Sequence, residues 1–131
     1  MAEDDVEMRR LVIEALRRDG HEVVDVTDGG QLLIRITEFY RLRPMPDPID
    51  LIVTDVRMPV CSGFDILQGL RDAAWVTPVI IMTAFGDDEA RTRARRLNAV
   101  LLDKPFEMSS LRSHVRELFR AREVRDAGKA G

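Results

Sequence analysis

Apolar residues along this sequence fall into two repeating patterns, one typical of helices and one typical of buried strands. Apolar positions spaced by three and four residues predict helices around 8–16, 32–40, 63–72, 87–96 and 111–119. Short runs rich in Val, Ile and Leu predict strands at 23–26, 49–55, 78–83 and 99–104. Gly20 stands where the first helix should stop, and Ser109 or Ser110 is expected to cap the last one.

The alternation of these elements predicts an α/β fold. Strands that alternate with helices form a parallel sheet with helices on both of its faces. The stretch ending at Pro48 also holds Pro44 and Pro46, so it is expected to be a loop. We expect one domain over residues 1–121 and a disordered C-terminal tail over 122–131.

Composition narrows the functional classes. The chain has 131 residues, a formal net charge of -3 and a single cysteine, Cys61. Neither nucleic acid nor an anionic membrane would be attracted by this charge, and one cysteine cannot form an internal disulfide. No apolar run approaches the roughly 20 residues of a membrane helix. We therefore expect a cytoplasmic protein that binds no nucleic acid directly and no membrane.

Three of the predicted strands end in polar residues of different chemistry. Asp55, Thr83 and Lys104 bring a carboxylate, a hydroxyl and an ammonium group. The carboxyl ends of parallel strands lie at one edge of a sheet, where ligands bind in open α/β folds. Glu3, Asp4 and Asp5 precede the first helix and are expected near the same edge.

Such a cluster suits phosphoryl transfer assisted by a metal ion. Carboxylates that lie close together repel one another unless a hard cation such as Mg²⁺ lies among them. An aspartate can attack phosphorus while the cation, a lysine and a hydroxyl offset the charge of the phosphoryl oxygens. Asp5 is expected only to cap the first helix or to place negative charge at its start.

Four ordered segments resemble bacterial response-regulator receiver domains, the family of the chemotaxis regulator. Residues 53–59 with Gly63 look like the family's phosphoacceptor region, and 2–10 like its acidic turn. Residues 80–84 resemble its fourth strand and 103–106 its fifth. The resemblance implies a flavodoxin-like doubly wound sheet of order 2-1-3-4-5, in which strand 1 is absent or truncated.

The resemblance also assigns roles to individual residues. It implies that Asp55 accepts a phosphoryl group from a sensor histidine kinase or a phosphotransfer protein, while Thr83 and Lys104 bind phosphoryl oxygens. Mg²⁺ would be held by Glu3, Asp4, Asp55 and the backbone carbonyl of Arg57. The fourth helix, fifth strand and last helix would signal to a downstream protein partner, and a homodimer is a further expectation. Such a stand-alone receiver is a switch and not an enzyme.

Several positions differ from the family pattern. Only Met1 and Ala2 precede the acidic pair where the family has a first strand, so we expect a segment upstream of Met1. Leu101 stands where many members carry an aromatic residue, and Asn98 where glycine is typical. Asn tolerates positive φ better than most residues. Arg57 and Phe85 occupy positions that tune phosphoryl lifetime, and neither is an obvious base, so we expect slow autodephosphorylation.

Two alternative functions and one ambiguous surface stay open at this stage. A degenerate receiver would bind partners without phosphorylation. A phosphatase of the haloacid-dehalogenase type is disfavoured, because those enzymes generally carry a second Asp where this chain has Arg57. A basic cluster on the fourth predicted helix is interpreted as a solvated face or as a docking surface; its members are Arg91, Arg93, Arg95 and Arg96.

Overall fold

The computed structural model describes residues 1–2, 5–41, 49–58, 60–84 and 86–130, so the predicted proline-rich loop lies largely outside the described residues. Along the chain the elements are α1 (Val6–Arg18), α2 (Gly29–Arg41), β1 (Ile52–Asp55), α3 (Gly63–Asp72), β2 (Val79–Thr83), α4 (Asp88–Arg96), β3 (Val100–Asp103) and α5 (Met108–Ala130). They follow the predicted pattern, except that the run at 23–26 contributes only one isolated bridge. Among the described residues, no helix combines the length and the apolar character that a membrane span requires.

Side chains at the predicted loop ends fix where the helices begin. The carboxylate of Asp5 accepts a hydrogen bond from the backbone of α1, and Asp87 does the same for α4. The hydroxyl of Ser62 caps α3 in the same way. Oxygen atoms at these positions satisfy backbone N–H groups that have no partner inside the helix. The prediction for α5 was wrong, because this helix begins at Met108, ahead of both candidate serines.

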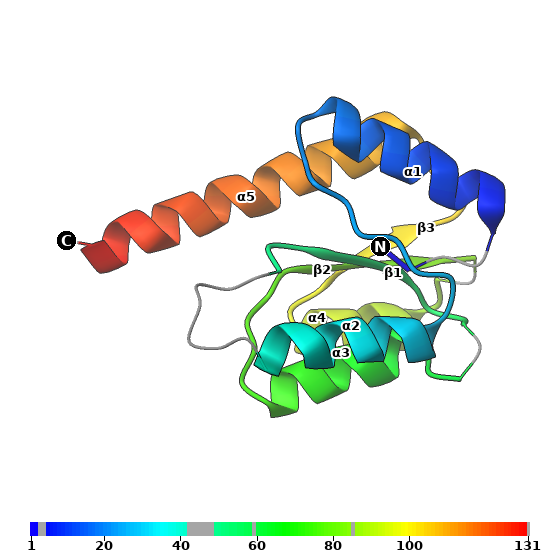
Figure 1. The fold of residues 1–131 in the computed structure, drawn as a ribbon, viewed down its shortest axis with the longest axis horizontal. Helices are drawn as coiled ribbons and strands as arrows, with labels where there is room; N and C mark the ends of the chain where they lie inside the picture. The colour runs from blue at the N-terminus through cyan, green and yellow to red at the C-terminus, as the bar shows by residue number, and fades with distance from the viewer. Residues whose placement is uncertain (3–4, 42–48, 59, 85, 131) are drawn as a thin grey trace.

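The described strands form a parallel sheet in the order β1-β2-β3, with helices on both faces (Figure 1). Helices α1 and α5 cover one face, and α2, α3 and α4 cover the other. In β2, Val79 and Ile81 pack into the core beneath α2–α4, while Ile80 and Met82 pack beneath α1 and α5. Because successive side chains of a strand point to opposite faces, a sheet covered on both sides needs an uninterrupted apolar run.

The first two residues of the chain pair with two other chain segments. Ala2 forms parallel bridges to both Val26 and Thr54, so it lies between the 23–26 run and β1. This is the place expected for the truncated first strand. The Met1 amine donates to the Val24 carbonyl at 3.0 Å, and burial lowers the pKa of this amine to about 6. The start of the described chain therefore lies inside the fold.

The last helix is longer than the sequence analysis expected. It continues through Ala130, beyond residue 122, where the disordered tail was predicted to begin. Residues 120–130 contain Arg, Glu, Lys and Ala but no proline, and these residues have high helix propensity. Figure 1 shows the C-terminal part of α5 projecting away from the sheet. Bidentate hydrogen bonds from Arg112 to Asp19, at 2.8 and 2.7 Å, join the N-terminal half of α5 to α1.

Arg71, at the end of α3, joins two loops at the edge opposite the polar strand ends. Its guanidinium donates to the carbonyls of Trp75 and Thr77 before β2, at 2.7 and 3.0 Å. It also donates to the carbonyls of Leu97 and Asn98 after α4, at 2.7 and 3.3 Å. Asn98 has a φ of 55°, so it adopts the left-handed conformation that the sequence analysis allowed for asparagine.

We predict that Arg71→Met destabilises the fold by roughly 2–4 kcal/mol, because partly buried carbonyls lose a charged donor. Urea unfolding followed by circular dichroism measures this change in the free energy of unfolding. Arg95→Met is the matched control: Arg95 is exposed on α4, and its removal should change stability by less than about 0.5 kcal/mol. Equal effects of the two substitutions would contradict the role assigned to Arg71.

Two glycines of α3 provide a matched test of how this helix meets β1. A Cβ at Gly63 would collide with the carbonyl oxygen of Asp55, whereas a Cβ at Gly69 would have nothing within 4 Å. Gly63→Ala should therefore lower stability by about 1–3 kcal/mol. Gly69→Ala should raise it by about 0.5–1 kcal/mol, because alanine favours the helix. Thermal unfolding of both variants checks these opposite signs.

Candidate functional site

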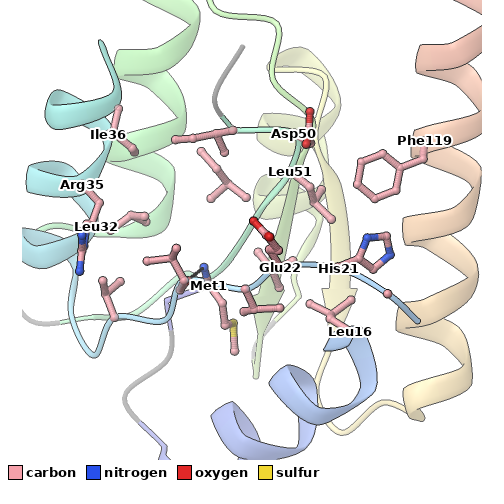
Figure 2. A pocket seen from close by; sticks show the side chains of 17 residues that line it. Met1, Leu16, His21, Glu22, Leu32, Arg35, Ile36, Asp50, Leu51 and Phe119 are labelled. Atoms are coloured by element: carbon pink, nitrogen blue, oxygen red, sulfur yellow. Dashed lines mark hydrogen bonds between the residues drawn. The ribbon is translucent and has the colours of Figure 1, made fainter. Parts of the chain in front are cut away.

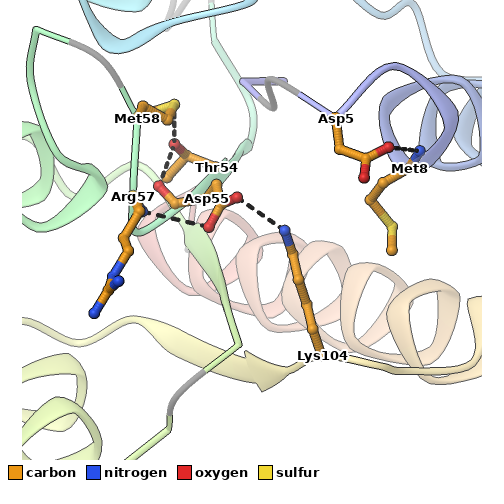
Figure 3. Close-up of polar contacts among 7 residues, drawn as sticks. All are labelled: Asp5, Met8, Thr54, Asp55, Arg57, Met58 and Lys104. Atoms are coloured by element: carbon orange, nitrogen blue, oxygen red, sulfur yellow. Dashed lines mark hydrogen bonds and ion pairs between the residues drawn. The ribbon is translucent and has the colours of Figure 1, made fainter.

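Asp55 and Lys104 form a direct ion pair at the edge where the strands end. Lys104 Nζ donates to Asp55 Oδ2 at 2.8 Å, and only 11% of the Asp55 side chain is exposed (Figure 3). The two residues are 49 positions apart, and Lys104 directly follows β3 and precedes a cis peptide bond to Pro105. A largely buried carboxylate needs such a partner, because losing its hydration is costly.

Thr83 ends β2, between the strands that carry these two residues. Asp55 is in register with Met82, and Thr83 is in register with Asp103. The Lys104 backbone N–H donates to the Thr83 carbonyl at 2.7 Å, and Thr83 is 5% exposed. The structure thus brings the three predicted residues to one edge, where the carboxylate and the ammonium are in contact.

The loop after Asp55 is organised around this carboxylate. The Arg57 backbone N–H approaches Asp55 Oδ1 at 3.4 Å, a long and weak hydrogen bond. The Thr54 hydroxyl donates to the Asp55 carbonyl at 3.1 Å and contacts Met58 Sδ at 3.6 Å. Gly63 donates its N–H to the Val56 carbonyl, which closes the loop against the start of α3. One carboxylate oxygen of Asp55 is therefore held by Lys104, and the other has only the weak Arg57 contact among the contacts shown in Figure 3.

The structure describes only part of the acidic segment that precedes α1. Glu3 and Asp4 lie outside the described residues. Asp5 caps α1 by accepting from the Met8 backbone N–H at 3.0 Å, the role expected for it. Within the described part of the chain, no group of three or more Asp, Glu, His or Cys residues is placed to hold a metal ion.

The sequence analysis missed a polar connection beside the site. Arg91 of α4 donates to Asp103 Oδ2 at 3.0 Å and to the Gly86 carbonyl at 2.7 Å. Asp103 directly precedes Lys104, and Gly86 follows Thr83 by three positions. We call these three residues the Arg91 clasp. The sequence analysis grouped Arg91 with the other arginines of α4. Its partner Asp103 lies 12 positions further along the chain, in β3, and no local sequence signal indicates this pair.

The other arginines of the basic cluster also differ from one another. The Arg93 guanidinium lies 4.8 Å from the centre of the Phe64 ring, a cation–π contact with α3. Arg95 and Arg96 are exposed. The cluster is therefore not a uniform solvated face, since Arg91 and Arg93 have identified partners.

The chemistry available at this edge follows from the contacts. Asp55 offers carboxylate oxygens at the surface of the sheet edge, and Lys104 brings a positive charge to within hydrogen-bonding distance of them. Thr83 contributes a hydroxyl from the strand between them. An anion entering here would meet a cation and hydrogen-bond donors, which is the arrangement that stabilises a phosphoryl group.

Comparison of the sequence with known families identifies the family to which the chain belongs. Residues 1–116 match the model of the response regulator receiver domain. The transcriptional regulatory protein CpxR of Escherichia coli is 35% identical over 121 residues, which are 92% of this chain and 48% of the relative. PdtaR of Mycobacterium tuberculosis is 31% identical over 112 residues, 85% of this chain and 51% of the relative. The chain spans about half the length of these curated relatives.

Comparison with solved structures shows that the chain has the fold of receiver domains. The receiver domain of the Francisella response regulator 1452 superposes with a TM-score of 0.80 at 26% identity, covering 92% of this chain and 94% of that one. The chemotaxis response regulator CheY4 of Vibrio cholerae gives 0.74 at 25% identity, with 89% and 93% coverage. The flavodoxin-like receiver fold predicted from the resemblance is thereby confirmed. The chain belongs to the response regulator receiver domain family.

Proposed function

We propose that this chain is a phosphoacceptor switch of a two-component phosphorelay, which receives a phosphoryl group on Asp55 from a histidine kinase or a phosphotransfer protein. The observation that carries the proposal is the partly buried Asp55–Lys104 pair at the carboxyl edge of the sheet. Membership of the receiver family supports it. The downstream partner is a protein that distinguishes the phosphorylated from the unphosphorylated state.

The transfer step requires little covalent chemistry from the chain. A carboxylate oxygen of Asp55 attacks phosphorus of a phosphohistidine and forms a P–O bond. The P–N bond breaks, its electron pair stays on the imidazole nitrogen, and that nitrogen takes up a proton. Lys104 then offsets the charge of the phosphoryl oxygens, and the Thr83 hydroxyl donates a hydrogen bond to one of them.

A magnesium ion fits the donor set that the family resemblance assigns to this edge. Glu3, Asp4, Asp55 and the Arg57 carbonyl would hold it, all through the oxygen atoms that Mg²⁺ prefers. Of these, Asp55 and Arg57 lie close together in the structure, and the Asp55 oxygen that faces away from Lys104 accepts a weak hydrogen bond from the Arg57 backbone N–H. The ion would supply positive charge that favours phosphoryl transfer to a carboxylate.

The signalling face we propose consists of α4, β3 and α5. The Arg91 clasp supports this choice, because it joins α4 to the residue before Lys104 and to the loop after Thr83. A shift of Lys104 or Thr83 toward a phosphoryl group would therefore act on α4 through Asp103 or Gly86. Phosphorylation adds a net charge of about -1.5 to -2 at pH 7. This change is large enough to shift the equilibrium between two arrangements of the signalling face.

The first experiment is phosphorylation by a small donor such as acetyl phosphate. We expect Mg²⁺-dependent labelling of the chain, abolished in Asp55→Asn, with the phosphate mapped to Asp55 by mass spectrometry. The control is Asp65→Asn, which removes an exposed carboxylate from α3 and should leave labelling intact. The label should persist for minutes or longer after the donor is removed. Labelling that survives in Asp55→Asn would contradict the assignment of Asp55.

One structural observation favours the degenerate receiver as a second candidate function. Ahead of α1, the described residues pair with the sheet through isolated bridges of Ala2 and form no extended strand. Weak anchoring would weaken the metal site and make partner binding independent of phosphorylation.

Thermal melting with Mg²⁺ and beryllofluoride separates the two candidates. For the phosphoacceptor we expect a higher melting temperature with both reagents than with Mg²⁺ alone, because a ligand bound only to the folded state stabilises it. At a ligand concentration 100 times Kd, this stabilisation is about 2.7 kcal/mol. Asp55→Asn should lose the additional shift. Absence of that shift in the unmodified chain would favour the degenerate receiver.

A further inference from the structure

The two residues to which the proposed function assigns the phosphoryl oxygens, Thr83 and Lys104, lie outside the apolar groove of this fold. That groove, of about 580 Å³, lies beside Met1 between residues 21–24 and 49–52 (Figure 2). Thr83 and Lys104 are not among the described residues that line it. The walls of the groove therefore do not set the distance between the two phosphoryl ligands. Contacts between chain segments at the phosphoacceptor edge hold them instead.

Two hydrogen-bonded connections join the segment that follows Thr83 to the segment that ends in Lys104. The first is the backbone hydrogen bond from the Lys104 N–H to the Thr83 carbonyl, at 2.7 Å. The second is the Arg91 clasp, in which one guanidinium donates to the Gly86 carbonyl at 2.7 Å and to the Asp103 carboxylate at 3.0 Å. Together, these contacts close a ring that contains both phosphoryl ligands.

Asp103 and Lys104 are neighbours in sequence but have partners on different sides. Leu101 packs into the core beneath α2–α4, so Asp103, two positions later, faces the same side by the alternation of a strand. Arg91 of α4 binds it there. Lys104 instead reaches Asp55 at 2.8 Å. The Arg91 clasp thus holds the residue next to Lys104 and leaves the ammonium group at the phosphoacceptor.

Gly86 fits the clasp closely. A Cβ on Gly86 would collide with Asp103 Oδ1 and would lie 3.4 Å from the Arg91 guanidinium. Residue 86 therefore has no room for a side chain while the Asp103 carboxylate is in the clasp. This close approach is a second observation, independent of the hydrogen bonds, that the loop after β2 and the end of β3 are packed against each other.

The clasp contributes geometry more than net charge or stability. The opposite charges of Arg91 and Asp103 cancel at 3.0 Å, so the pair adds little to the field that an anion at Asp55 would meet. About half of each of the two side chains is exposed, and exposed ion pairs contribute little to the stability of a fold. Loss of the clasp should therefore alter the arrangement of the phosphoryl ligands more than the free energy of unfolding.

We propose that Arg91 is a positioning residue for phosphoryl binding. It holds the segments that carry Thr83 and Lys104 at a distance at which the hydroxyl and the ammonium reach one phosphoryl group. The inference rests on the proposed phosphoacceptor function and adds a residue of α4 to it. Because coupling between two sites is reciprocal, a partner that pulled Arg91 away from Asp103 would weaken phosphoryl binding.

Calorimetric titration with beryllofluoride at saturating Mg²⁺ measures the affinity for a phosphoryl mimic. We expect Arg91→Met and Asp103→Ala each to weaken binding about three- to tenfold, and the double variant to weaken it no further, because the two residues act as a pair. Removal of the Asp103 charge alone would favour an anion, so weakening by Asp103→Ala indicates positioning. The matched control is Arg95→Met, which removes an exposed cation from the same helix and should change affinity by less than about twofold.

Two further variants separate positioning from a general loss of structure. Gly86→Ala displaces the Asp103 carboxylate from the other side, so it should weaken beryllofluoride binding to a similar degree. Arg91→Lys keeps the charge but lacks the fork that binds two acceptors, so its affinity should be intermediate. Without ligand, the melting temperature of Arg91→Met should fall by less than about 3 °C. Mg²⁺ alone should bind Arg91→Met as it binds the unmodified chain, because the proposed metal ligands are not part of the ring.

The outcomes distinguish this inference from the proposed function. If the unmodified chain shows no beryllofluoride binding that Asp55→Asn abolishes, the phosphoacceptor function fails, and the inference fails with it. If the unmodified chain binds the mimic and Arg91→Met binds it equally well or more tightly, only the role of Arg91 is overturned. Equal weakening by Arg95→Met, or tighter binding by Asp103→Ala, would also overturn that role, since charge and not position would then explain the effect.

Discussion

Burial of the parallel strands on both faces is the constraint on which the rest of this structure depends. A strand covered by helices above and below carries mostly apolar side chains between its ends, so its charged groups gather at the sheet edges. Parallel pairing then gathers the carboxyl ends of β1, β2 and β3 at one edge. The Asp55–Lys104 pair results from this geometry, since 49 positions of chain separate two groups that lie 2.8 Å apart.

Two arginines, Arg71 and Arg91, bind loops at opposite edges of the sheet, and they differ in their partners and in their exposure to solvent. Arg71 binds four backbone carbonyls at the edge away from Asp55, so it holds the turns before β2 and after α4 in one arrangement. The Arg91 clasp lies at the phosphoacceptor edge and is exposed, with 45% of the Arg91 side chain accessible. Exposed ion pairs contribute little to stability and are easily rearranged. One edge is therefore rigidly tied, while the other can change its contacts.

The N-terminal residues pair with β1 on one side and cap α1 on the other. Ala2 is buried and hydrogen-bonded to β1, and Asp5 caps α1 three positions later. The chain between them carries the acidic residues to which the family resemblance assigns the metal ion.

Apart from the run at 23–26, the sequence by itself determined the order and type of the elements, because apolar periodicity and strand-end polarity are local properties of the chain. It also placed Asp55, Thr83 and Lys104 at one edge, since that follows from parallel pairing alone. Only the tertiary structure decided the partners of Arg71 and Arg91, the pairing of Ala2 with two segments, and the apolar groove beside Met1. Each of these depends on the distance between residues far apart in sequence, and spacing along the chain does not encode that distance.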